Sequence, residues 1–72
     1  MGKLTFMQEV VLECLHKYYN KHLRMPLQSE IKEMIGVNSN ATVHKHLHNL
    51  EKKGYIIITP KFRRGIAFTE NN

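Results

Sequence analysis

The side chains able to recognise a ligand are concentrated between residues 38 and 54, in the segment NSNATVHKHLHNLEKKG. At helical spacing, Val43, Leu47 and Leu50 fall on one narrow apolar stripe, which predicts a helix with a single buried face. The other face carries lysines, histidines and small polar side chains, and Glu51 is the only acid in the segment. Such a face suits phosphates and base edges, whereas a solvated basic surface without a partner is the alternative for the charges alone.

Two sets of residues are expected to contact DNA, and Asn40 and Lys45 are the best shaped for adenine and guanine respectively. The set expected at base edges or nearby phosphates is Ser39, Asn40, Ala41, Thr42, His44 and Lys45. The set expected to supply charge to the DNA backbone is His48, Lys52, Lys53, Lys61, Arg63 and Arg64. Phe62 lies among the last cations, and the sequence leaves open whether it packs or touches a sugar.

A metal site and a catalytic site are the alternatives to DNA contact for these side chains. His44 and His48 lie four residues apart with Glu51 three further on, a spacing that can supply metal ligands. Structural zinc needs four ligands, and no fourth has an obvious route to the site, so no metal is expected. His46 lies at the edge of the apolar stripe and is expected to pack. The serines and histidines show no nucleophile, base and oxyanion donor in one arrangement, so neither an enzyme nor a cofactor is expected.

Size and charge narrow the class of protein. The 72 residues are expected to form one domain, residues 1–72, and 42% hydrophobic residues suffice for a small core. The formal charge of +5 favours an acidic partner, with nucleic acid before an anionic membrane surface. Cys14 is the only cysteine, which excludes an intrachain disulfide and fits a reducing, cytoplasmic setting. No apolar run approaches the roughly 20 residues of a membrane span.

The local patterns predict an α+β winged helix-turn-helix. Thr5 with Gln8 is a capping-box pattern and predicts a helix over residues 6–22. A second helix is expected over residues 28–35, closed by Gly36, and a tight turn then leads to the helix at Asn40. Two β-rich runs, residues 55–59 and 66–69, flank a basic loop, and they predict a two-stranded hairpin, the wing.

In this arrangement the chain resembles the N-terminal DNA-binding domain of LexA-type SOS repressors over nearly its whole length. The matching residues are Leu4, Thr5, Gln8, Met25, Pro26, Glu30, Ile31, Gly36, Ser39, Ala41, His46, Leu47, Leu50, Lys53, Gly54, Arg64, Gly65 and Ile66. The resemblance implies a sequence-specific transcriptional regulator that binds double-stranded DNA, with a second copy on an adjacent half-site, and neither a membrane nor a small-molecule substrate.

Three departures from the family pattern affect what can be expected. Leu27 stands where the family has a Ser or Thr that caps the second helix, so that cap must come from elsewhere or be absent. His44 and Lys45 replace acidic residues of the best-known members, which predicts a different operator. The sequence stops where the family's linker begins, so without the peptidase and dimerisation domain we expect weak self-association.

A winged helix that binds and modulates a host repressor is the alternative from another class, because winged helices also serve as protein adaptors. Retention on heparin or nonspecific DNA separates the two readings, since an adaptor should elute at low salt.

Overall fold

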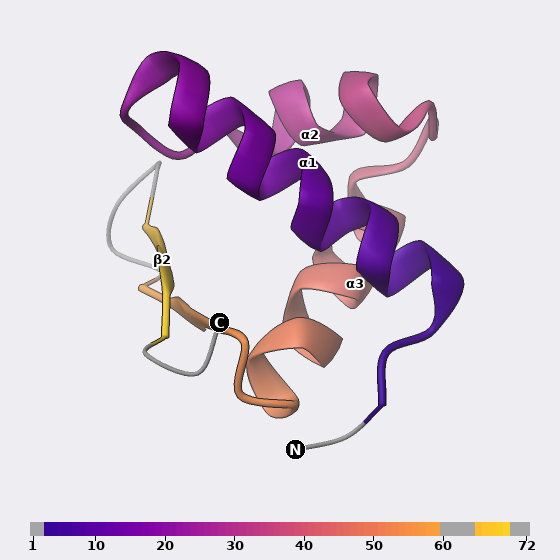
Figure 1. Ribbon diagram of the computed structural model, residues 1–72. Helices are drawn as coiled ribbons and strands as arrows, with labels where there is room; N and C mark the ends of the chain where they lie inside the picture. The colour runs from indigo at the N-terminus through magenta and orange to yellow at the C-terminus, as the bar shows by residue number, and fades with distance from the viewer. Residues whose placement is uncertain (1–2, 60–64, 70–72) are drawn as a thin grey trace.

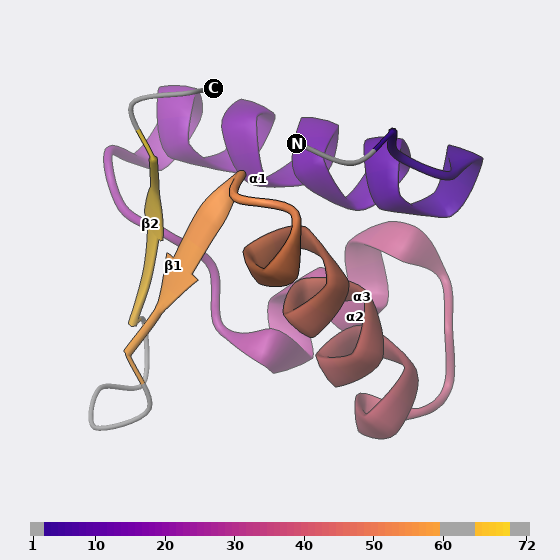
Figure 2. The same cartoon turned by 90° about the horizontal axis from the view of Figure 1, so that it is seen from below.

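The computed structural model describes residues 3–59 and 65–69. Its elements follow the order α1 (Phe6–His22), α2 (Gln28–Ile35), α3 (Asn40–Lys52), β1 (Ile56–Ile58) and β2 (Ile66–Phe68). The two strands stand to one side of the three helices (Figures 1 and 2). Three helices followed by an antiparallel hairpin make a winged helix, which confirms the predicted fold class.

The start of α1 is fixed by the predicted capping box. Thr5 Oγ1 accepts a hydrogen bond from the Gln8 amide at 3.2 Å, and Gln8 Oε1 accepts one from the Thr5 amide at 3.1 Å. The helix ends at Leu23, whose backbone lies in the left-handed region with φ 58° and whose N–H donates to the Tyr19 carbonyl. The bounds predicted for this helix are confirmed.

Helix α2 obtains its N-terminal cap from within its own first turn. Leu27 occupies the cap position and has no side-chain acceptor, but Glu30 Oε1 accepts from the Leu27 amide at 2.7 Å. The other carboxylate oxygen of Glu30 accepts from the Tyr18 hydroxyl at 2.7 Å, which connects α1 with α2. At the other end Gly36 adopts φ 75°, a conformation that favours glycine because it lacks Cβ.

One core joins the three helices to β1. Its buried members are Val11, Leu15, Ile31, Val43, Leu47, Leu50 and Ile56. Each buried aliphatic side chain of this kind contributes about 1.5–3 kcal/mol relative to an exposed one. The apolar stripe predicted for the helix between residues 38 and 54 is therefore confirmed, and it attaches α3 to the rest of the domain.

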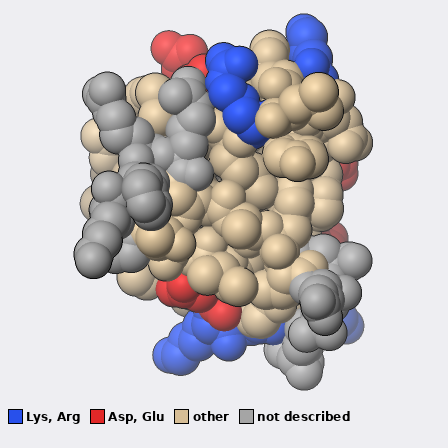
Figure 3. Space-filling view, turned by 90° about the vertical axis from the view of Figure 1, so that its left-hand side faces the viewer, with Lys and Arg blue, Asp and Glu red and all other residues tan. Residues whose placement is uncertain are grey.

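The wing is shorter than its sequence pattern indicated. β1 begins at Ile56; the Tyr55 amide donates to the Leu50 carbonyl at 3.0 Å, while the Tyr55 carbonyl accepts from the Thr69 amide at 3.2 Å. Ile57 pairs with Ala67 across the hairpin, and both lie on its exposed face. Figure 3 views this side of the molecule, and charged side chains lie toward the margins of the face and not over its middle.

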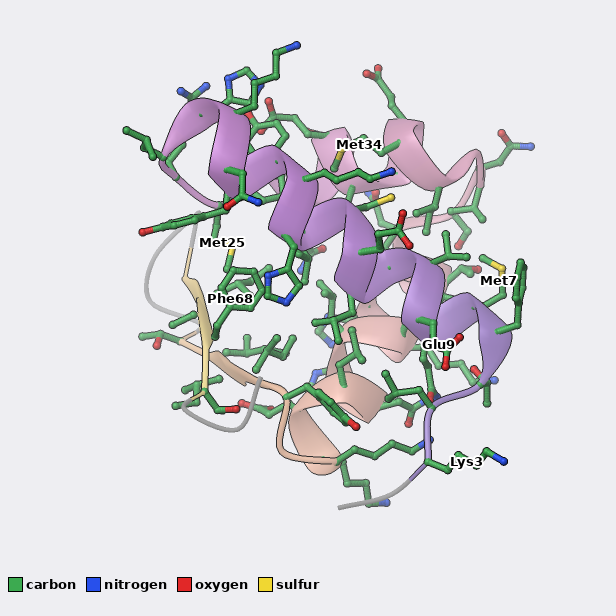
Figure 4. The ribbon with its side chains drawn as sticks, in the orientation of Figure 1. Lys3, Met7, Glu9, Met25, Met34 and Phe68 are labelled. Atoms are coloured by element: carbon green, nitrogen blue, oxygen red, sulfur yellow. The ribbon has the colours of Figure 1, made fainter. Side chains whose placement is uncertain are left out.

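Phe68 attaches the second strand to α1. The His16 ring stacks on the Phe68 ring with centroids 4.0 Å apart and planes 3° apart, and Tyr19 meets Phe68 edge-on at 5.9 Å. Figure 4 shows Phe68 on the side of β2 that faces the helices. These aromatic contacts hold the wing against the same helix that packs on α3.

Candidate nucleic-acid interface

The first turn of α3 is presented to solvent by a side-chain cap. Ser39 occupies the cap position, and its Oγ accepts a hydrogen bond from the Ala41 amide at 3.2 Å. Ser39, Asn40 and Ala41 are all exposed, while Thr42 is half-buried at the margin of the core stripe. The positive end of the helix dipole lies at this turn, so the turn favours an anionic ligand such as phosphate.

The middle and end of α3 carry exposed donors on the side opposite the core. His44, Lys45, His48 and Lys52 are exposed. The rings of His44 and His48 meet edge-on with centroids 4.2 Å apart, so the two imidazoles form one exposed pair. Asn40, His44 and Lys45 are thus accessible in the first half of the helix, and His48 and Lys52 are accessible in the second.

Glu51 does not share the exposed face with the histidines. Its Oε2 accepts a hydrogen bond from the Ile58 amide at 2.8 Å, so the carboxylate is directed toward β1. Within residues 3–59 and 65–69, no three His, Cys, Asp or Glu side chains lie together as metal ligands. The third ligand that the sequence spacing offered to His44 and His48 is therefore engaged in holding the wing.

Lys53 is placed differently from the other predicted phosphate ligands. The residue is half-buried, and its Nζ donates to the Lys3 carbonyl at 2.6 Å and to Gln8 Oε1 at 2.6 Å. Lys3 lies on the segment leading into α1 (Figure 4). This role has no local signal in the sequence, because the two acceptors of Lys53 lie 50 and 45 residues away along the chain.

The remaining predicted residues divide between packing and the wing loop. His46 is half-buried, in agreement with its expected packing role, and its Nδ1 has no hydrogen-bond partner in the part of the chain that the structure describes. Lys61, Phe62, Arg63 and Arg64 lie outside the described residues. Their assignment to the DNA backbone stays a prediction.

Together, α2 and α3 form a helix-turn-helix, and the hairpin that follows makes this chain a winged-helix DNA-binding domain. No helix in the described part is long and apolar enough to cross a membrane. The model of the LexA DNA binding domain matches residues 1–65. The chain belongs to the LexA DNA-binding domain family.

Similar curated proteins are LexA repressors. The chain is 40% identical to the LexA repressor of Caldicellulosiruptor saccharolyticus over 97% of its length, and 38% identical to that of Geobacillus kaustophilus over 100% of its length. The LexA repressor of Shouchella clausii is 42% identical over 92% of the chain. These alignments cover 35%, 35% and 32% of the relatives, so the chain spans about a third of the proteins it matches.

Proposed function

We propose that this chain binds a specific DNA sequence through α3 and thereby acts in transcriptional repression. The observation that supports this most strongly is an exposed, donor-rich face on α3 in a chain whose family is a DNA-binding domain. In helix-turn-helix proteins the second helix lies in the major groove, and its first residues contact the bases. The exposed first turn of α3 is suited to that position.

Base reading is assigned to the first half of α3 and its cap. The proposed set is Ser39, Asn40, Ala41, Thr42, His44 and Lys45. Asn40 has both a donor and an acceptor for an adenine edge, and Lys45 donates to guanine O6 and N7. Thr42 is half-buried, so only the exposed part of its side chain is expected to reach a base.

Attraction to the DNA backbone is assigned to cations farther along the chain. His48 and Lys52 are exposed on α3, and the wing loop adds Lys61, Arg63 and Arg64. Such contacts raise the affinity for every sequence and set the register of the protein on the duplex. Lys53 is also expected in this group from its sequence position, but its ammonium donates to the Lys3 carbonyl and to Gln8 Oε1.

Residues 1–72 are proposed to act as one domain. This domain is proposed to bind at a promoter, in the cytoplasm. The LexA repressors it resembles are about three times as long, and repression would follow from blocking access to the DNA. A second copy on an adjacent half-site, spaced by about one helical turn or a multiple, is part of the proposal. The domain itself is proposed to carry no catalytic activity.

Selection from a randomised duplex library tests base reading. The native chain should recover a defined motif, and Lys45→Ala should relax selection at one base pair by about 5- to 150-fold, the worth of one good base contact. Lys52→Ala is the matched control, because it removes the same charge from the same helix and should weaken all sequences about equally. Identical motifs from the native chain and Lys45→Ala would show that Lys45 does not read a base.

A further inference from the structure

Helix α3 is held at its C-terminal end from two sides. On the wing side, Glu51 accepts from the Ile58 amide at 2.8 Å, and the Thr69 hydroxyl donates to the Gly54 carbonyl at 2.6 Å. On the opposite side, the attachment to the chain's beginning passes through Lys53. Two hydrogen bonds made by this one ammonium group connect the end of α3 with the N-terminal segment.

The acceptors of Lys53 are themselves fixed. Gln8 Oε1 accepts from both the Lys53 ammonium and the Thr5 amide, so one buried oxygen connects the cap of α1 to the end of α3. The second acceptor, the Lys3 carbonyl, lies on the segment that enters this cap. Two of the three N–H donors of this ammonium are engaged beside a side chain that is 5% exposed, so a bidentate contact with a phosphate would require at least one of these bonds to break.

We propose that Lys53 is a positioning residue for DNA recognition: it sets the orientation of α3 by tying its C-terminal end to the cap of α1, and it does not contact DNA. This inference rests on the proposed sequence-specific binding by α3. It changes the expected role of Lys53, whose neighbour Lys52 keeps the role of a phosphate contact.

The geometry of the helix explains why an attachment at its far end affects base reading. Helix α3 has 13 residues and is therefore about 20 Å long. A rotation of about 3° about its C-terminal end would move the first turn by about 1 Å over that length. Base contacts require positions within about 0.5 Å, so Asn40 and Lys45 would lose alignment while backbone attraction persisted.

Lys53→Met removes the ammonium and keeps the aliphatic chain, and Lys52→Met is the matched control on an exposed neighbour. The probes are the duplex recovered by selection with the native chain and a scrambled duplex of equal length, each titrated over a range of salt. Lys53→Met should weaken binding to the selected duplex by at least about 5-fold, the low end of one base contact. It should leave scrambled-duplex affinity and the slope of log K against log salt unchanged. Lys52→Met should weaken both duplexes and make the slope shallower by about 0.9.

A second variant tests the same tie without altering any cation. Gln8 is 5% exposed and has no access to DNA, so Gln8→Met affects recognition only through the structure. Gln8→Met removes one of the two Lys53 acceptors and one bond of the α1 capping box, and the Lys53 bond to the Lys3 carbonyl remains. It should cause a selective affinity loss, and the double variant should lose less than the sum of the two single losses, because both side chains share one hydrogen bond. If Lys53→Met does not fold, Gln8→Met still tests whether this connection affects DNA recognition.

Three results would overturn the inference. A shallower salt slope with equal loss on both duplexes would make Lys53 a phosphate contact. Unchanged affinity of the folded variants together with a lower melting temperature would reduce the tie to a stabilising contact. Additive losses in the double variant would show that the two side chains act separately. Failure of the native chain to prefer its selected duplex, by contrast, refutes the proposed function itself.

Discussion

The left-handed residue at the end of α1 offers a direct test of how the backbone of this domain is held. Leu23 adopts φ 58° and ψ 29°, and the residue is 79% exposed. A left-handed conformation is unfavourable by about 1–2 kcal/mol for a residue with Cβ, whereas glycine has no Cβ and adopts it without this penalty. Glycine also makes the unfolded chain more flexible, which costs about 0.4–1 kcal/mol. Leu23→Gly should therefore raise the free energy of unfolding by about 0.5–1 kcal/mol.

A gain of this size should raise the melting temperature by about 2–8 °C in a domain of this length. Thermal unfolding followed by circular dichroism, together with urea denaturation, measures it. Leu23→Ala is the matched control, because it removes the exposed side chain and keeps the strained backbone, so its effect should stay within about 0.5 kcal/mol. A lower melting temperature for Leu23→Gly, or equal stabilisation by Leu23→Ala, would refute the strain argument.

Two further predictions concern the wing and the thiol. Glu51→Ala should lower the free energy of unfolding by about 1–3 kcal/mol, because it leaves the Ile58 amide without its acceptor. Glu51→Gln keeps an oxygen at this position and should lower the free energy of unfolding by less. Equal losses for the two variants in urea denaturation would contradict this prediction. Burial raises the pKa of the Cys14 thiol above its ordinary value, so less thiolate forms near neutral pH. Cys14 should therefore react with a disulfide reagent more slowly than it does in the urea-unfolded chain, and equal rates would contradict the burial of the thiol.

The elements defined by local signals could be predicted from the sequence. Thr5 and Gln8 mark the start of α1, and Gly36 marks the end of α2, because capping depends on residues within one turn. Leu27 was the difficult case, since its own side chain cannot cap α2. The signal was nevertheless local, because Glu30 three residues later accepts from the Leu27 amide.

The contacts that depend on tertiary structure could not be predicted in the same way. Lys53 is followed in sequence by Gly54 and looked like one more exposed cation, but its acceptors lie 50 and 45 residues earlier in the chain. Glu51 was grouped with His44 and His48 by helical spacing, whereas its actual partner is an amide beyond the end of α3. Helical periodicity places a residue on a face and does not identify what packs beside that face.

We propose above all that this domain binds DNA through phosphates and distinguishes sequences through α3. The most direct measurement is the dissociation constant of the native chain for its selected duplex between about 50 and 200 mM salt. With about four to six cations at phosphates, the slope of log K against log salt should be about −4 to −5, with the selected duplex bound more tightly than a scrambled one throughout. A flat salt response, or equal affinity for the two duplexes, would contradict the claim.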